Sequence, residues 1–278
     1  MEHAPRKVTA RDRLLLEFIA EHRLVLSNHV QALLGVSAKT AARRLRALEQ
    51  AGFVAREALF YRYPAHYRIQ RRGLELIGTR VGVPKRGLNV AHDVGVAWLW
   101  LAARRGAFGP LADVVSERTM RSRDRTEAHA IRVTGRSQHE PFGVRLSGQG
   151  PKGAPRLHYP DLLLVDRQGR RLAVELELSS KGRSRRHQII GAYAFDRRVD
   201  AVLYLVSDQR VAREVQEAAR RFGSERTIIV QRVRIGAGQV PAPMAVAARD
   251  GPRGSGRGPT PERPSATHGV RRAQELTL

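Results

Sequence analysis

The chain has 278 residues, of which 42% are hydrophobic, so it is long and apolar enough for two domains with their own cores. Its 50 lysines and arginines outnumber 26 aspartates and glutamates, and the formal charge of +24 favours a polyanionic partner, nucleic acid first. The lack of cysteine excludes disulfides and cysteine-ligated zinc. No apolar run could span a bilayer, and residues 1–13 lack the core of a signal peptide. We therefore expect a cytoplasmic protein without membrane contacts.

Residues 9–52 predict three helices joined by tight turns. Thr9 and Ser27 stand where the caps of the first two helices are expected, and Gly35 ends the second. The third helix, "AKTAARRLRALEQAG", has a buried stripe and stops at Gly52. The expected core residues of the first and third helices are Leu14, Leu15, Phe18, Ile19, Ala41, Leu45 and Leu48.

The opposite face of this third helix is polar and basic. At 100° per residue it gathers side chains that donate to phosphates and purine edges, as a recognition helix does in the major groove. Its expected DNA-binding residues are Lys39, Thr40, Arg43 and Arg46, with Gln50 beside them. A merely solvated basic face is the competing interpretation.

Residues 53–80 predict a wing and a closing helix. Two strands, 53–60 and 66–70, join through a turn at Pro64, and "RRGLELIG" follows as a helix. Arginines alternate with tyrosines here, a mixture suited to a phosphate backbone. The expected DNA contacts are Arg56, Arg62 and Arg68. Residues 9–80 thus predict a winged-helix DNA-binding domain; winged helices also mediate protein contacts, and the basic stripe favours DNA.

A bridging helix, "LNVAHDVGVAWLWLAARRG", should begin near Asn89 and is apolar almost all round. We expect it to be buried between domains or against a second subunit, which makes a homodimer one expectation. His92 is interpreted as a core or cap residue rather than a metal ligand. Trp98 and Trp100 are interpreted as packing residues.

Residues 88–234 predict an α/β domain. After a polar, glycine-rich excursion through Gly153 come strands at 159–165 and 171–178, joined by a turn at Gln168-Gly169. A basic helix, a buried strand "DAVLYLVS", a helix over 208–222 and a strand "RTIIVQRV" follow. Right-handed crossovers would make the later strands parallel. The fold class is thus α/β (α+β overall), a winged helix-turn-helix followed by a restriction-endonuclease-like domain.

Three carboxylates mark a candidate metal site in this domain. Glu175 and Glu177 share one face of a strand because side chains alternate, and Asp161 begins the preceding strand. Together Asp161, Glu175 and Glu177 would suit Mg²⁺. A half-exposed strand produces the same alternation without any metal.

The winged helix, "AHDVGVA", "VVSERTMRS", "YPDLLLVD" and "LAVELELSSK", in this order, resemble the replication-relaxation family of plasmid and mobile-element proteins, whose second domain is PD-(D/E)xK nuclease-like. The resemblance covers residues 9 to 233. It implies a double-stranded DNA-binding protein that assists replication, relaxation or transfer, with a relaxase or replication protein as partner. It also places Glu117, Asp161 and Glu175 at the acidic positions of the nuclease-like site.

The sequence departs from an active nuclease of this type at one position. Glu177 stands where a lysine is expected near the attacking water, and a carboxylate there repels the scissile phosphate. Lys181 could replace that lysine from the start of the next helix. We expect no nuclease activity; the alternatives are a Mg²⁺-dependent endonuclease using Glu117, Asp161, Glu175 and Lys181, and a winged-helix transcriptional repressor. Residues 235–278, rich in Gly, Pro, Ser and Arg, predict a disordered basic tail.

Overall fold

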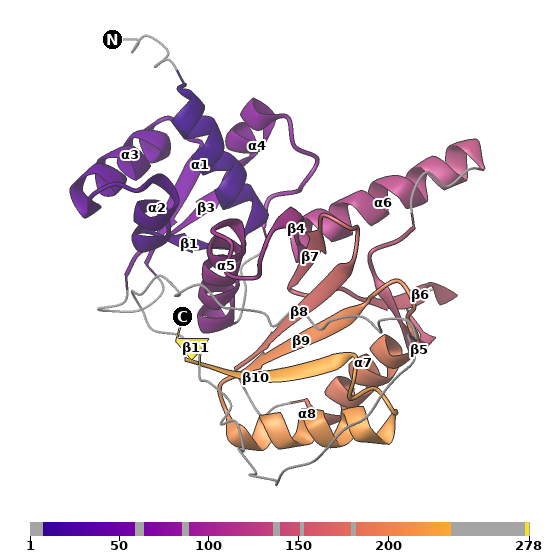
Figure 1. Cartoon of the computed structure of the whole chain (residues 1–278). Helices are drawn as coiled ribbons and strands as arrows, with labels where there is room; N and C mark the ends of the chain where they lie inside the picture. The colour runs from indigo at the N-terminus through magenta and orange to yellow at the C-terminus, as the bar shows by residue number, and fades with distance from the viewer. Residues whose placement is uncertain are drawn as a thin grey trace, which may run out of the picture.

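The computed structural model describes residues 8–58, 64–84, 89–135, 140–150, 153–178, 182–234 and 276–277. The chain is α/β, with helices and strands in both halves (Figure 1). None of the helices in these ranges is both long and apolar enough to cross a lipid bilayer.

Helices and a small sheet form the N-terminal unit. The sheet is antiparallel with strand order β1-β3-β2. Its elements are α1 (Ala10–Glu21), β1 (Val25–Leu26), α2 (Ser27–Leu34), α3 (Ala38–Gln50), β2 (Val54–Glu57), β3 (His66–Ile69) and α4 (Arg71–Ile77).

Local signals explain most of the helix ends. Thr9 and Asp12 form a capping box at the start of α1, and Gly35 ends α2 in the left-handed conformation. Ser27 is not a cap, which corrects the expectation. It is the first residue of α2, because Leu26 before it pairs with His66 in the sheet, and the His29 ring accepts the Leu26 N–H at 3.0 Å.

Two further expectations for the N-terminal unit need correction. Leu14 is 42% exposed, because α1 buries the face that carries Leu15, Phe18 and Ile19. The first wing strand ends at Glu57, and residues 59 and 60 of its predicted continuation lie outside the described residues. The unpredicted strand β1 pairs with β3 and is only two residues long, too short to show an alternating pattern.

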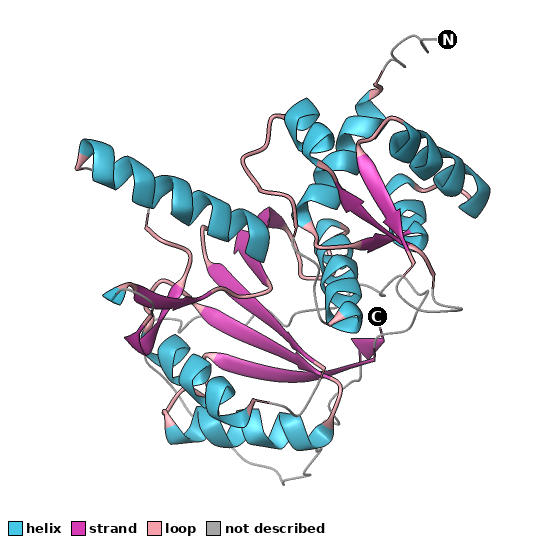
Figure 2. Cartoon of the chain, turned by 180° about the vertical axis from the view of Figure 1, so that it is seen from behind, coloured by secondary structure: helices cyan, strands magenta, loops and turns pink. Residues whose placement is uncertain are grey.

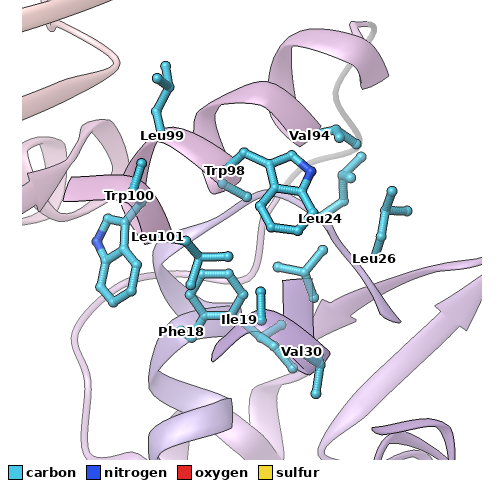
Figure 3. Close-up of a cluster of buried hydrophobic side chains, with 14 of the residues drawn as sticks. Phe18, Ile19, Leu24, Leu26, Val30, Val94, Trp98, Leu99, Trp100 and Leu101 are labelled. Atoms are coloured by element: carbon cyan, nitrogen blue, oxygen red, sulfur yellow. The ribbon is translucent and has the colours of Figure 1, made fainter. Parts of the chain in front are cut away.

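The bridging helix α5 (Val90–Arg104) joins the two halves. Asn89 caps it by accepting the His92 N–H at 3.2 Å, as its predicted start implies. Trp98 and Trp100, 1% and 9% exposed, lie among side chains of α1, β1 and α2 (Figure 3). Because α5 is buried almost all round, it fills the space between the N-terminal unit and the large sheet.

The C-terminal half is built on a six-stranded mixed sheet of order β11-β10-β9-β8-β7-β4. The strands β4, β7 and β8 are antiparallel neighbours, and β8 to β11 are parallel, as right-handed crossovers predict. The elements are β4 (Leu111–Ser116), α6 (Glu117–Thr134), β5 (Val144–Gln149), β6 (Pro155–His158), β7 (Leu162–Asp166), β8 (Arg171–Glu177), α7 (Arg183–Phe195), β9 (Ala201–Val206), α8 (Gln209–Arg221), β10 (Ile228–Arg234) and β11 (Leu276–Thr277).

Helices cover both faces of this sheet. The side chains of Ala173, Val202 and Tyr204 belong to the cluster beneath α7 and α8, whereas Val174 and Leu203 belong to the cluster that includes α5. Figures 1 and 2 show α7 and α8 on the face away from the N-terminal unit. Successive residues of β8 therefore face different layers, as its alternating sequence predicts.

A polar, glycine-rich excursion was expected from residue 123 through Gly153, and the structure has regular elements there. They are most of the 18-residue helix α6 and the strand β5, which pairs with β6. Ser116 caps α6 by accepting the Thr119 N–H at 3.2 Å. Its buried side chains are Met120, Asp124 and Glu127. Two of these three are acidic, so the helix shows no apolar stripe in the sequence.

Part of the tail that was predicted to be disordered, residues 235–278, forms a strand. Leu276–Thr277 form β11 and pair in parallel with Val233 and Arg234 at the edge of the sheet. An edge strand offers unpaired backbone groups, which explains how so short a segment can add to it. Residues 235–275 lie outside the described residues.

We predict that Trp98→Ala lowers the free energy of unfolding by about 3–5 kcal/mol, because it empties a large buried volume where α5 meets the N-terminal unit. Urea denaturation measures the change. Phe195→Ala, which removes an 80%-exposed side chain, is the control and should change stability by less than about 0.5 kcal/mol. Equal effects of the two substitutions would contradict a shared core at α5.

Candidate functional site

A cavity of about 590 Å³ opens where α5, α6, β7, β8 and α7 meet. Charged side chains of both signs line it, drawn from both halves of the chain. The residues on which its chemistry depends are Arg23, His92, Glu117, His158, Asp161 and Glu175. All three acidic positions implied by the family resemblance are among them.

The sheet topology brings these carboxylates together. Glu117 follows directly on β4, and Asp161 directly precedes the antiparallel neighbour β7, so the Glu117 N–H donates to the Asp161 carbonyl at 3.1 Å. Glu175 lies on β8, the next strand. The N–H of the following residue, Leu176, donates to Asp161 Oδ2 at 2.8 Å. Three sequence-distant acids therefore meet at one end of three adjacent strands.

Glu117 is held by two arginines. Arg23 Nη2 lies 2.8 Å from its Oε2, and Arg121 Nε lies 2.8 Å from its Oε1. Burial alone would raise the pKa of Glu117, but the hydrogen bonds and charges of the two guanidinium groups lower it overall. Arg23 also lies 3.9 Å from Asp93. The Glu117 carboxylate is thus ionised and has both oxygens engaged.

Asp161 is paired with His92, whose Nε2 lies 3.1 Å from Oδ2. Burial would lower the pKa of His92, but the charge and hydrogen bond of Asp161, with help from Asp93, raise it to about 11. His92 is therefore an imidazolium at neutral pH. Both its ring nitrogens carry protons, so it cannot bind a metal in this state. We expected a core or helix-cap residue, and His92 in addition forms an ion pair with Asp161.

Glu175 is buried and accepts two hydrogen bonds at one oxygen, from His158 Nε2 at 2.6 Å and from the Tyr193 hydroxyl at 2.5 Å. Burial opposes the charged form of His158, yet Glu175 raises the pKa of this histidine overall. Burial, and then the charge of Glu175, raises the pKa of Tyr193. Tyr193 therefore stays protonated and donates.

Glu177 shares the strand face of Glu175 but interacts with a different cation. Arg186 Nε lies 3.5 Å from its carboxylate, and Arg186 Nη1 lies 2.7 Å from Glu214. The expected Mg²⁺ site of Asp161, Glu175 and Glu177 is not assembled. In the described ranges no three His, Cys, Asp or Glu side chains are arranged to hold a metal ion. The carboxylates as placed do not fit Mg²⁺, because arginines bind both oxygens of Glu117 and the cationic His92 pairs with one oxygen of Asp161. Lys181 lies outside the described residues.

The second candidate site is the outer face of α3. Ala41, Leu45 and Leu48 are buried as predicted. The opposite side chains Lys39, Arg43, Arg46 and Gln50 are exposed, and Thr40 is half-buried with its hydroxyl 3.1 Å from that of Ser37. Lys39, Arg43 and Arg46 make no ion pair with any residue of the described ranges, whereas their neighbour Arg44 pairs with Asp12 on α1.

The wing arginines differ from one another. Arg56 on β2 is exposed. Arg68 on β3 pairs with Glu57 and donates to the Pro84 carbonyl at 3.2 Å, so it is not free to contact phosphate, contrary to expectation. Arg62 lies outside the described residues.

Sequence reasoning missed the residues that neutralise the pocket. Arg23 is 94 residues from Glu117, and no local pattern links them. His158 stands two residues before the Pro160-Asp161 pair, a position that could have marked it as a neighbour of that site. Tyr193 lies on the basic helix that follows β8, and its buried hydroxyl donates to Glu175.

Comparison of the sequence with protein-family models and with curated proteins returns no match.

We predict that His92→Gln destabilises the protein by about 1–3 kcal/mol at pH 6, because it leaves Asp161 without its buried cation. Because the pKa of His92 is higher in the folded than in the unfolded protein, its ion pair stabilises the fold fully below the unfolded-state pKa near 6.5. This stabilisation is lost as pH rises toward about 11. The difference from the unsubstituted protein should thus shrink between pH 6 and pH 10, as measured by urea unfolding. His129→Gln, at an exposed position on α6, is the control. A difference that does not vary with pH would contradict the ion pair.

Proposed function

We propose that this chain binds double-stranded DNA through α3, with its N-terminal unit acting as a winged helix. The observation that carries the proposal is the one-sided charge of α3. One face is buried, and the other presents Lys39, Arg43 and Arg46 with no acidic partner in the described ranges. Cations left unpaired on a projecting helix face are available to phosphates and to purine edges.

The dimensions of α3 suit the major groove. The helix has 13 residues and is about 20 Å long, and the groove of B-DNA is about 12 Å wide, enough to admit a helix. Arg43 and Arg46 are three residues apart and so project together. In this proposal the antiparallel pair β2–β3, on which Arg56 is exposed, is the wing that contacts the adjacent backbone.

We further propose that the six-stranded sheet is a nuclease-like domain that does not cleave DNA. Metal-dependent hydrolysis needs carboxylates whose oxygens are free for the ion. Here both oxygens of Glu117 are bound by Arg23 and Arg121. One oxygen of Asp161 is bound by His92, and one oxygen of Glu175 is bound by His158 and Tyr193. The domain would then serve DNA docking, in a protein that assists replication or transfer of a plasmid or mobile element in the cytoplasm.

A Mg²⁺-dependent endonuclease is the second candidate, and one observation favours it. The three acidic positions meet in one open pocket at the ends of β4, β7 and β8, although nothing in their local sequence requires this. Cleavage would require Arg23 and His92 to move away from Glu117 and Asp161.

We predict that Arg43→Ala with Arg46→Ala lowers affinity for duplex DNA about tenfold. Two lost phosphate contacts should also reduce the slope of log K against log salt by about 1.8. Fluorescence anisotropy over a salt series measures both quantities. The matched control is Arg213→Ala with Arg220→Ala, which removes the same charge from exposed positions on α8.

Unchanged affinity and slope in a folded α3 double variant would refute DNA binding by this helix. An equal loss in the α8 variant would show that only net charge matters.

We also predict that the purified protein leaves supercoiled and nicked plasmid intact with either Mg²⁺ or Mn²⁺, because its carboxylates are engaged and Glu177 replaces the expected cation. Agarose gel electrophoresis provides the measurement. Metal-dependent cleavage that both Asp161→Ala and Lys181→Ala abolish would establish the endonuclease instead.

A further inference from the structure

The helix α6 is anchored at its start and extends beyond the sheet at its far end (Figures 1 and 2). Arg118 donates to the carbonyls of Ala20 at 2.9 Å and Gly82 at 2.6 Å, which fixes the first turn to the N-terminal unit. Asp124, 8% exposed, accepts the N–H groups of Phe142 and Gly143. These contacts hold the projecting part of the helix in a defined direction.

The charges of α6 are sorted by face. Glu117 points into the charged pocket, and Asp124 and Glu127 are both 8% exposed. The exposed charged side chains of the helix are all arginines, namely Arg121, Arg123, Arg125 and Arg132. An ordinary solvated helix mixes both signs on its outer face, so this segregation indicates an anionic partner.

The four exposed arginines of α6 differ in their contacts with the described residues. Arg121 pairs with Glu117 and lies 4.4 Å from the centre of the Tyr159 ring, and Arg123 lies over Phe142. Arg125 and Arg132 form no ion pair with any residue that the structure describes. They are seven residues apart, so they share one face at a separation of about 10 Å along the axis.

The position of α6 relative to α3 is set by α1. At its N-terminal end, Asp12 pairs with Arg44 on α3. At its C-terminal end, Glu21 accepts hydrogen bonds from Thr119, at 2.8 and 2.9 Å, and from Ser116. One helix is therefore bonded to both basic helices, and a partner that touches both must span a fixed distance.

We propose that α6 is a second phosphate-binding arm, which grips the backbone of the same DNA duplex outside the α3 site through Arg125 and Arg132. This inference rests on the proposed DNA binding by α3. Arginine contacts to phosphate need no particular base, so the arm adds affinity without sequence preference. The proposal also requires affinity to depend on the length of the duplex, because only DNA that extends beyond α3 as far as Arg125 and Arg132 gains these contacts.

The test compares two mixed-sequence duplexes, one of about 12 base pairs, little more than a helical turn, and one of about 40 base pairs. Arg125→Ala with Arg132→Ala should leave binding to the short duplex unchanged. On the long duplex it should weaken binding several-fold and reduce the salt slope by about 1.8. The Arg213→Ala with Arg220→Ala variant on α8 is the control for lost charge.

The outcomes separate the two proposals. If the α6 variant matches the α8 control on the long duplex, the arm is refuted and α3 binding stands. If the Arg43→Ala with Arg46→Ala variant binds both duplexes as the unsubstituted protein does, the proposed function fails. A loss in the α6 variant that is equal on both duplexes would also overturn the arm, because the effect would not depend on reach.

Discussion

The ion pair between Arg23 and Glu117 is the contact on which the rest of the structure depends. Arg23 follows α1 in the N-terminal unit, and Glu117 begins α6 on the large sheet, so one pair at 2.8 Å joins the two halves and neutralises the pocket between them. Separating the halves would remove Arg23 from Glu117 and leave only Arg121, on the same helix, to balance this half-buried carboxylate. The hydrogen bonds from Thr119 to Glu21 reinforce the same junction. The N-terminal unit is therefore fixed to the sheet.

Apolar packing acts in the same direction. A single hydrophobic cluster runs from Leu15 on α1, through Trp98 on α5, to Leu176 and Val233 on the sheet. The predicted segments 9–80 and 88–234 thus share a core at α5, although each has its own sheet. The apolar character of α5 on every side predicted burial but not the partners, which only the tertiary arrangement supplies. A helix shared in this way makes local detachment of either half unfavourable.

The sequence predicted elements whose signals are local, and missed those defined by distant contacts. Glycine stops and a buried stripe identified α3, and alternation assigned Glu175 and Val174 to opposite faces of β8. The helix α6 escaped notice because two of its three buried side chains are acids, and one of them, Asp124, accepts backbone N–H groups of Phe142 and Gly143. The acidic positions of the pocket were visible in short motifs. The cations that pair with them were not visible, because an ion pair between residues 94 positions apart produces no periodic pattern in the sequence.

The ion pairs that neutralise the acids of the pocket also determine which movements could release its carboxylates. The pKa of His92 is raised to about 11, so no change of pH within the physiological range removes its charge from Asp161. Releasing the carboxylates would require movement of Arg23 with α1 and of His92 with α5, and α5 is packed in the shared core. Such movement would disrupt apolar contacts as well as ion pairs. The pocket is thus best understood as a rigid electrostatic junction, in which acids of the large sheet are paired with cations from both halves of the chain.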